Sequence, residues 1–415
     1  MELISPATLL KLKDEALLEA VARQTFRFFW EGAEPASLMA RDRSTKSADP
    51  PNDLVAVGGT GFGVMAMVTA VERGWVARAD ALARLRHMLD VLERAERYHG
   101  AYPHFLHGET GKTIPFGPLD DGGDLVETAF LMMGLLAARH YFAEDATLTT
   151  RTTALFDAVE WDWYRQGENV LYWHWSPRHG WAMDHTIRGW NETLIVYVLA
   201  AGASHHVIGA DVYQEGFCQS DDYRNGQTYH GVTLPLGPAL GGPLFFTHYS
   251  FCGLDPHGLT DGHVDYWRQN EAQVTINRAH CIANPGRFKG YGPDCWGLTA
   301  SDDPSGYDAH APNNDNGTIS PTAALSSFPY APDAAMAALR HFLSAHGEKV
   351  WGRFGFTDAF NETRDWWADT FLAIDQGPIV VMMENYRSGL LWKHFMAAPE
   401  VQKGLRTLGF RSPKA

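Results

Sequence analysis

The feature that most limits the fold is the alternation of apolar, helix-forming segments with long loops rich in Gly, Pro, Asp and aromatic residues. Within the segments, apolar residues recur at spacings of three and four, which predicts helices. Loops this long are unusual in a compact domain unless they carry function. The predicted helices are Lys13–Trp30, Gly61–Arg73, Ala79–Tyr98, Asp124–Phe142, Ala146–Trp161, Asn191–Ser204, Val264–Ala283, Thr322–Leu325 with Asp333–Ala345, and Thr370–Phe395 with a break near Gly377-Pro378.

Paired helices with a long loop before one member of each pair are typical of an (α/α)6 toroid, in which an inner ring of helices surrounds a pocket and an outer ring covers it. We therefore expect an all-α barrel, with a few short strands such as Val170–Trp175 or Leu244–Tyr249 at the active-site end. A plain bundle or an α-solenoid is the alternative, although no repeat of roughly 30 to 45 residues is visible. No low-complexity linker divides the chain, so residues 1–415 are expected to form a single domain.

The charge balance excludes several classes of partner. The chain has 34 Lys and Arg against 49 Asp and Glu, a net charge of −15. Nucleic acids and anionic membranes require clustered positive charge, so neither is expected as a partner. An aromatic share of 12 % suits either a carbohydrate site, where rings stack on sugars, or simply a large core. The beginning of the sequence lacks a signal-peptide pattern, which predicts a cytoplasmic location, or a periplasmic one if a signal peptide has been removed.

Known cofactor and metal motifs are missing from the sequence. There is no GxGxxG after a strand, no Walker loop, no GxSxG and no HExxH, so no cofactor or metal is expected. This pattern disfavours hydride transfer, phosphoryl transfer and serine hydrolysis. The four cysteines form no CxxC pair, although a Cys252–Cys281 or Cys218–Cys295 disulfide is conceivable in an oxidising compartment.

The densest polar cluster is LDDGGDLVETAFL, which contains Asp120, Asp121, Asp124 and Glu127. Asp124 and Glu127 lie one turn apart at a helix start, where they share a face and the helix dipole stabilises negative charge. A capping box, with Asp124 as N-cap and Glu127 three residues on, is the structural alternative. Asp120, beyond a Gly-Gly bend, is not explained by capping.

Glu192 is a second candidate, at a helix start in IRGWNETLIVYVLA. We expect its neighbour Trp190 to desolvate it, which would raise its pKa and suit it to act as a general acid. A helix-start Glu is also common for dipole reasons alone.

Asp375 is a third candidate, because it interrupts an apolar helix. A buried charge must be paired or functional, and Arg387 or Lys393 could be its partner. Glu384 and Arg387, three residues apart, are predicted to form an internal ion pair.

Further candidates for sugar binding occur in loops rich in aromatic and polar residues. Each is as readily explained as a hydrogen-bonding loop residue or a core residue. They are His104, Trp190, Lys289, Tyr291, Trp296, Asp303 and Asp308.

Seven motifs, in order along residues 13 to 411, resemble the bacterial glucoamylase-like family, glycoside hydrolase family 144. They are TGFGVMA, DLVETAFLMMGLL, WNETLIVYVLA, PLFFTHYSFCGLD, YGPDCWGLTASD, ISPTAALSSFPYAP and AIDQGPIVVMMENYRSGLLWKHF. The resemblance implies an (α/α)6 barrel that hydrolyses β-1,2-glucans to sophorose or short oligosaccharides with inversion at the anomeric carbon.

The resemblance places the family's acidic cluster on Asp120, Asp124 and Glu127, its helix-start glutamate on Glu192 and its late aspartate on Asp375. His104 matches the family's YPHF histidine, and Asp303 or Asp308 could replace Asp375. We expect Glu192 to be the general acid and Asp375 the base, with Asp124 as the rival base. A monomeric β-1,2-glucan hydrolase is the leading interpretation; a transglycosylase on the same glucan and a non-catalytic glucan-binding protein are the alternatives, and α-glucan specificity stays open.

Overall fold

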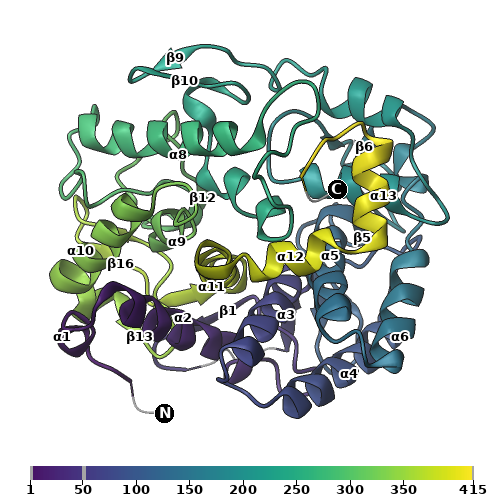
Figure 1. The fold of residues 1–415 in the computed structure, drawn as a ribbon, viewed down its shortest axis with the longest axis horizontal. Helices are drawn as coiled ribbons and strands as arrows, with labels where there is room; N and C mark the ends of the chain where they lie inside the picture. The colour runs from purple at the N-terminus through teal and green to yellow at the C-terminus, as the bar shows by residue number, and fades with distance from the viewer. Residues whose placement is uncertain (1–2, 49–52, 414–415) are drawn as a thin grey trace.

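The computed structural model describes residues 3–48 and 53–413 and is mostly helical (Figure 1). Its α-helices run through the whole chain and are joined by short strands, turns and 3₁₀ segments. They are α1 (Pro6–Leu9), α2 (Asp14–Trp30), α3 (Val57–Glu72), α4 (Arg78–Arg94), α5 (Leu125–Tyr141), α6 (Ala146–Asp157), α7 (Leu194–Gly202), α8 (Tyr266–Ala283), α9 (Pro321–Leu325), α10 (Pro332–Val350), α11 (Ala373–Ser388), α12 (Leu390–Met396) and α13 (Pro399–Thr407).

The helices divide into central and peripheral ones. α3, α5 and α7 are buried on nearly every side and are apolar all round, as expected of helices inside a large core. α2, α4 and α10 have one buried face and one exposed face. In Figure 1, α11 is near the middle of the molecule, whereas α4, α6, α8 and α10 lie at its periphery.

Glycines allow α3 and α5 to cross closely, and this crossing positions the first turn of α5. A Cβ on Gly61 would lie 2.0 Å from the carbonyl oxygen of Phe130, and one on Gly134 would lie 2.1 Å from that of Gly61. Any larger residue at either position would push the helices apart. One turn earlier, the same contact brings Gly58 of α3 against Glu127 of α5.

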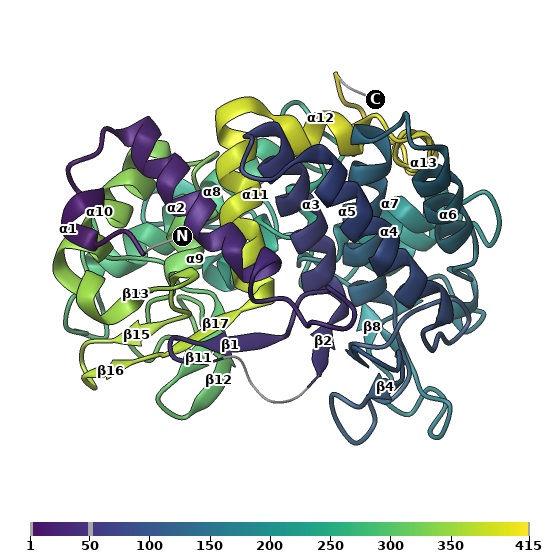
Figure 2. The ribbon, with the colours of Figure 1, turned by 90° about the horizontal axis from the view of Figure 1, so that it is seen from below.

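The strands are two to four residues long, and most of those labelled in Figure 2 lie together on one side of the molecule. β2, β3 and β4 form a three-stranded antiparallel sheet, and the others pair in twos. The strands are β1 (Arg43–Thr45), β2 (Leu54–Ala56), β3 (Phe105–His107), β4 (Thr113–Ile114), β5 (Gly123–Asp124), β6 (Leu171–Tyr172), β7 (His174–Trp175), β8 (Thr186–Ile187), β9 (Thr228–Tyr229), β10 (Val232–Thr233), β11 (Ala300–Asp303), β12 (Gly306–Ala309), β13 (Trp351–Gly352), β14 (Gly355–Phe356), β15 (Phe360–Asn361), β16 (Trp366–Trp367) and β17 (Thr370–Leu372).

The predicted helices are present, with shifted ends and one misplaced break. α11 runs straight through Gly377-Pro378 and ends at Gly389, whose φ of +67° terminates the helix before α12. Thr370–Leu372 is a strand instead of the first turn. The expected strand at Leu244–Tyr249 is also wrong, because Leu244–Thr247 forms a 3₁₀ helix.

Of the ion pairs predicted near the end of the chain, Glu384–Arg387 is present, although it is not the shortest contact of either residue, and Arg387–Asp375 is not formed. Glu384 pairs mainly with Arg73, whose Nε lies 2.7 Å from Oε2, while Arg387 Nη1 is 3.9 Å away. Arg387 instead donates to Glu19 at 2.8 Å and to Glu15. Arg387 therefore does not neutralise Asp375.

The four cysteines are buried free thiols, so neither of the two conceivable disulfides is formed. Across residues 3–48 and 53–413, no helix combines the length and the apolar character needed to cross a membrane.

Candidate active site

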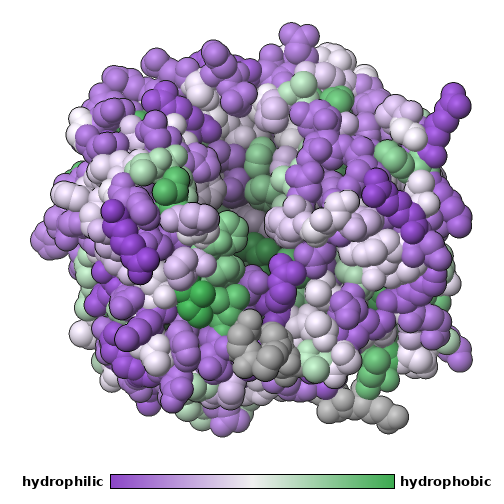
Figure 3. Space-filling view, turned by 180° about the vertical axis from the view of Figure 1, so that it is seen from behind, coloured by the Kyte–Doolittle hydropathy of each residue, from purple (hydrophilic) through white to green (hydrophobic). Residues whose placement is uncertain are grey.

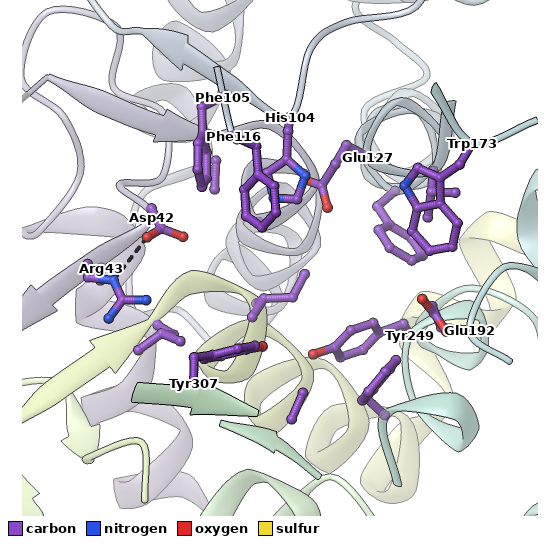
Figure 4. A pocket seen from close by; sticks show the side chains of 18 residues that line it. Asp42, Arg43, His104, Phe105, Phe116, Glu127, Trp173, Glu192, Tyr249 and Tyr307 are labelled. Atoms are coloured by element: carbon purple, nitrogen blue, oxygen red, sulfur yellow. Dashed lines mark hydrogen bonds and ion pairs between the residues drawn. The ribbon is translucent and has the colours of Figure 1, made fainter. Parts of the chain in front are cut away.

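A pocket of about 350 Å³ opens on the side of the molecule that carries the strands, where Figure 3 shows a hollow. Its walls come from residues far apart in the sequence (Figure 4). Carboxyl groups of Asp42, Glu127 and Glu192 reach it, beside His104 and Arg43. The aromatic part of the lining consists of Phe105, Phe116, Phe130, Trp173, Phe245, Tyr249 and Tyr307.

Asp124 organises the first acidic cluster of the pocket. It is the N-cap of α5, and its Oδ1 accepts hydrogen bonds from the backbone N–H groups of Val126 and Glu127, both at 2.9 Å. Its Oδ2 lies 3.2 Å from both His104 Nδ1 and Trp173 Nε1. Because both oxygens of this fully buried carboxylate are occupied, Asp124 holds His104 and Trp173 in place rather than presenting a free oxygen to the pocket.

Glu127 does not form the capping box that its spacing allowed. Its Oε2 instead accepts a hydrogen bond from Gly58 N–H at 2.6 Å, across the α3–α5 crossing. Burial raises the pKa of Glu127 to about 7, against the opposing effect of His104 and with help from Asp124. Burial also lowers the pKa of His104, but the charges of Glu127 and Asp124 outweigh it and raise the pKa to about 9. At neutral pH an imidazolium therefore faces a carboxyl group that titrates near neutrality.

Asp120 extends the first cluster away from the pocket wall. Burial, and then the charge of Asp124, raise the pKa of Asp120 to about 7. Its Oδ1 lies 3.3 Å from Nε2 of His174, which accepts a hydrogen bond from Gly122 N–H at 3.0 Å. Asp120 is thus a partly protonated neighbour of the site, and it is not among the side chains that line the pocket.

Glu192 approaches the pocket from the segment just before α7. The hydroxyl of Ser250 donates to the backbone carbonyl of Glu192 and accepts from Ile195 N–H at 3.0 Å, which fixes the start of the helix. Burial, followed by the charges of Asp124 and Glu127, raises the pKa of Glu192 to about 7. Glu192 is 9 % exposed, so it can hold a proton near neutral pH and still reach a ligand.

A second carboxylate cluster lies behind the wall formed by β1, β12 and β17. Asp302 contacts Arg43 Nη1 at 3.2 Å, and its backbone N–H donates to Asp358 at 2.6 Å. Asp375, in the first turn of α11, is 3 % exposed. Among the described residues its carboxyl group meets no N–H or hydroxyl donor, and its hydrogen-bond partner is the carboxyl group of Asp358.

The charges of this second cluster are strongly coupled. Burial, and then the charge of Asp358, raise the pKa of Asp375 well above its usual range. Burial, and then the charge of Asp302, raise the pKa of Asp358 to about 7. Asp375 does not line the pocket, but its charge reaches Tyr249 on the wall, where burial followed by that charge raises the tyrosine pKa. Asp358 and Asp375 therefore form a pair that retains a proton at neutral pH.

The aromatic residues that the sequence proposed for sugar binding lie in the core or at the surface instead. Trp190 is 2 % exposed, and its Nε1 donates to Gln273 at 2.8 Å. It does not line the pocket, contrary to the expectation of a sugar-binding role. Trp296 is fully buried, and the Tyr291 hydroxyl donates to Asp315 at 2.7 Å.

The polar candidates of the later loops are also absent from the pocket wall. Asp303 accepts a hydrogen bond from Asn316 Nδ2 at 2.8 Å, which ties one loop to another. Asp308 is exposed on β12 and accepts from Asn314 at 3.1 Å. Lys289 is exposed on a separate loop.

Sequence reasoning missed several residues of the wall, namely Asp42, Arg43, Trp173, Tyr249 and Tyr307. Each belongs to a short strand, a turn or a 3₁₀ segment with no periodic pattern. Their only sequence signal was their position in the long loops, which were expected to be functional.

Comparison with known proteins agrees with this fold and pocket. Residues 184–399 match the Glycoamylase family model, described as "Putative glucoamylase". An endo-β-1,2-glucanase from Chitinophaga pinensis, solved with sophorotriose and glucose, is 52 % identical with a TM-score of 0.95, covering 97 % of this chain and 100 % of that chain. The fold and the acid-lined pocket thus define a helical protein of the glucoamylase class. The chain belongs to the glucoamylase-like family, glycoside hydrolase family 144, as its motifs predicted.

Two further similar proteins support conclusions of different scope. An exo β-1,2-glucooligosaccharide sophorohydrolase (non-reducing end) of Parabacteroides distasonis is 45 % identical over 97 % of this chain, which spans 59 % of that relative's length. The glucoamylase of Hormoconis resinae is 12 % identical with a TM-score of 0.53, covering 90 % of this chain and 73 % of the other. The second likeness concerns the fold alone.

Proposed function

We propose that the protein hydrolyses β-1,2-glucan or β-1,2-glucooligosaccharides with inversion of the anomeric carbon. The observation that carries the proposal is the convergence of Glu127 and Glu192, two carboxyl groups that titrate near pH 7, on one aromatic pocket. The full-length likeness to an endo-β-1,2-glucanase and the likeness to a sophorohydrolase support the linkage. The aromatic walls suit the apolar faces of glucose rings.

Glu192 is the proposed general acid. An inverting hydrolase must protonate the leaving oxygen with one carboxylic acid while a second carboxylate activates water on the opposite face of the sugar. Glu192 fits the first role because burial keeps its proton near neutral pH and its side chain reaches the pocket. Loss of this proton at higher pH removes the acid, so activity falls as the pH rises above about 7.

Two carboxylates are proposed for the base, and they differ in how they reach water. Asp375, favoured by the sequence, is buried beside Asp358 and does not line the pocket. It could act as the base only if water molecules connect its carboxyl group to the sugar. Glu127 is on the wall itself, and the nearby His104 cation favours its ionised form. Asp124, the earlier rival, is proposed as a positioning residue because its oxygens are occupied.

The proposal includes the finer architecture. α3, α5, α7, α9 and α11 would belong to the inner ring of an (α/α)6 barrel, and α2, α4, α6, α8 and α10 to the outer ring. The central place of α11 and the peripheral places of α4, α6, α8 and α10 in Figure 1 support this arrangement. We also propose that residues 1–415 act as one domain and as a monomer.

Transglycosylation is the second candidate function, because the same acid and base can pass the glycosyl group to a sugar hydroxyl instead of water. An added acceptor distinguishes the two reactions, since it increases longer products only if transfer competes with hydrolysis. A non-catalytic binding protein is a third candidate. It would keep the aromatic wall but would tolerate loss of the Glu192 carboxyl group.

The proposal is tested by a product time course on linear β-1,2-glucan, with soluble starch and β-1,3-glucan in parallel. We expect release from the β-1,2-linked polymer alone: sophorose from the first minutes for exo action, or a ladder of oligosaccharides for endo action. Glu192→Gln serves as the matched inactive control. Release from starch but not from β-1,2-glucan would overturn the proposed substrate.

A further inference from the structure

Away from the pocket, Cys295, His341 and His346 bring one sulfur and two nitrogen atoms within 4.8 Å of one another. Cys295 lies in a turn bridged to Gly292, and both histidines are on α10. None of the three lines the pocket. The cluster therefore belongs to a different part of the molecule from the proposed chemistry.

The histidine nitrogens of this cluster lack hydrogen bonds. Nε2 of His341 and Nε2 of His346 are buried, and neither has a hydrogen-bond partner among the described residues. His346 is only 9 % exposed, and the two ring centroids are 5.4 Å apart. Buried nitrogens are almost always paired. His346 has the Glu362 carboxylate beside it, so the unpaired nitrogen is that of His341, and its place beside a thiol and a second imidazole points to a cation that accepts its lone pair.

Glu362, just after β15, lies beside the cluster and contacts one of its histidines. Its Oε1 lies 3.1 Å from His346 Nε2, a close contact that lacks hydrogen-bond geometry. Gly290 makes room for this carboxylate, because a Cβ at that position would lie 1.9 Å from Oε1.

We propose that Cys295, His341 and His346 bind a Zn²⁺ ion, with Glu362 as the outer partner of His346. One thiolate and two imidazoles match the ligands of this borderline-soft cation, which prefers four ligands in a tetrahedron. On binding, the Cys295 thiol releases its proton to solvent, and the sulfur donates an electron pair to the metal without any redox change.

Three protein ligands leave the fourth position to water, and because the cluster lies outside the pocket we assign the ion a structural role. It links the turn at 292–295, helix α10 and the segment after β15. The rings of Phe360 and Trp367, with centroids 4.9 and 5.0 Å from that of His346, hold this ligand in orientation.

Two other groups of potential metal ligands occur among the described residues, but the atoms of one already have hydrogen-bond partners and the other belongs to the pocket. In the group Cys218, Asp261 and His263, the carboxylate accepts from three tyrosine hydroxyls, and both ring nitrogens of His263 contact Arg224 or Gln214. The group His104, Asp120 and Asp124 belongs to the pocket. His263→Gln is consequently a matched control for a histidine ligand.

The test titrates the chelator-treated full chain with Zn²⁺ against a chromophoric competitor, and with Co²⁺ as a spectroscopic probe. We expect one tight Zn²⁺ per chain, and with Co²⁺ a thiolate-to-metal charge-transfer band together with tetrahedral d–d bands. Cys295→Ser should abolish the charge-transfer band. His346→Gln should weaken Zn²⁺ binding at least about 100-fold, more than loss of an outer partner costs, whereas His263→Gln should leave it unchanged.

His341→Gln keeps the test decisive if His346→Gln fails to fold, because His341 is only half-buried. Circular dichroism establishes that each variant is folded, and Zn²⁺ should raise the melting temperature of the parent protein but not of the ligand variants. The proposal is overturned if the folded parent binds no stoichiometric Zn²⁺, if the Co²⁺ spectrum lacks the thiolate band, or if His263→Gln weakens binding as much as the ligand variants.

Discussion

The two carboxylate clusters beside the pocket hold their charges in different ways. At the start of α5, Asp124 has donors for both oxygens and Glu127 faces the cation of His104. At the start of α11, Asp375 has no N–H or hydroxyl donor within the described residues, and its hydrogen-bond partner is another carboxyl group, that of Asp358. The first cluster can present an ionised carboxylate to a ligand, whereas the second stores a proton. Spacing in the sequence does not distinguish these two states.

Removing the carboxyl group of Glu192, the proposed general acid, should reduce activity more than any other change. Glu192→Gln keeps the shape of the side chain but cannot donate the proton, so kcat on linear β-1,2-glucan should fall about 10²- to 10⁴-fold. Affinity for sophorotriose, measured by calorimetry, should change little. Unchanged kcat in the folded variant would remove Glu192 from the mechanism.

The next effect distinguishes the two candidate bases through His104. His104→Asn removes the cation that favours ionised Glu127, so the pKa of Glu127 should rise. If Glu127 is the base, the acidic limb of the kcat/KM profile should move upward by about one pH unit. His140→Asn, outside the pocket, is the control.

An acidic limb that stays in place in His104→Asn would assign the base to Asp375. Glu127→Gln and Asp375→Asn would then be compared at the pH optimum. The variant with the greater loss of kcat identifies the base.

The second cluster makes a prediction about stability. Because the folded-state pKa of Asp375 lies above that of an unfolded Asp, about 4, its contribution is full at low pH and is lost as the pH rises through the folded-state value. Asp375→Asn should therefore gain unfolding free energy relative to the parent as the pH rises from about 4 to 8. Chemical denaturation measures this, with the exposed Asp369→Asn as control. A constant difference across that range would contradict the proposed charge coupling.

The smallest effect is expected at the mouth of the pocket. Phe116 is 59 % exposed, and its ring stacks on His104 with centroids 4.3 Å apart. Phe116→Ala should raise KM about three- to tenfold, the value of one aromatic contact, with kcat nearly unchanged. Trp163→Ala, an exposed aromatic residue that is not on the pocket wall, should leave both constants unchanged. Equal effects of the two changes would place the binding surface elsewhere.

The sequence predicted the parts of the molecule that repeat a local pattern. Helix periodicity located most helices, and the Asp124 cap and Glu192 were recognised at helix starts. The break was predicted at Gly377-Pro378 instead of Gly389 because proline usually ends a helix. Here α11 continues through Pro378, which lies inside the helix and removes the one hydrogen bond that an N–H would donate to the Ile374 carbonyl.

The remaining parts of the site depend on tertiary contacts that no spacing encodes. Asp42 and Trp173 reach the pocket from segments without periodicity, and Trp190 was misplaced because adjacency in sequence does not decide which way a ring points. Cys295 and His346 likewise meet only in the folded chain.

The most direct test of the central claim is ¹H NMR of the first product formed from linear β-1,2-glucan, recorded before mutarotation. Two carboxyl groups acting on opposite faces of the sugar predict that the new reducing end appears first as the α-anomer. A β-anomer at the earliest time points would mean retention, and would contradict the assignment of Glu192 and its partner base to an inverting mechanism.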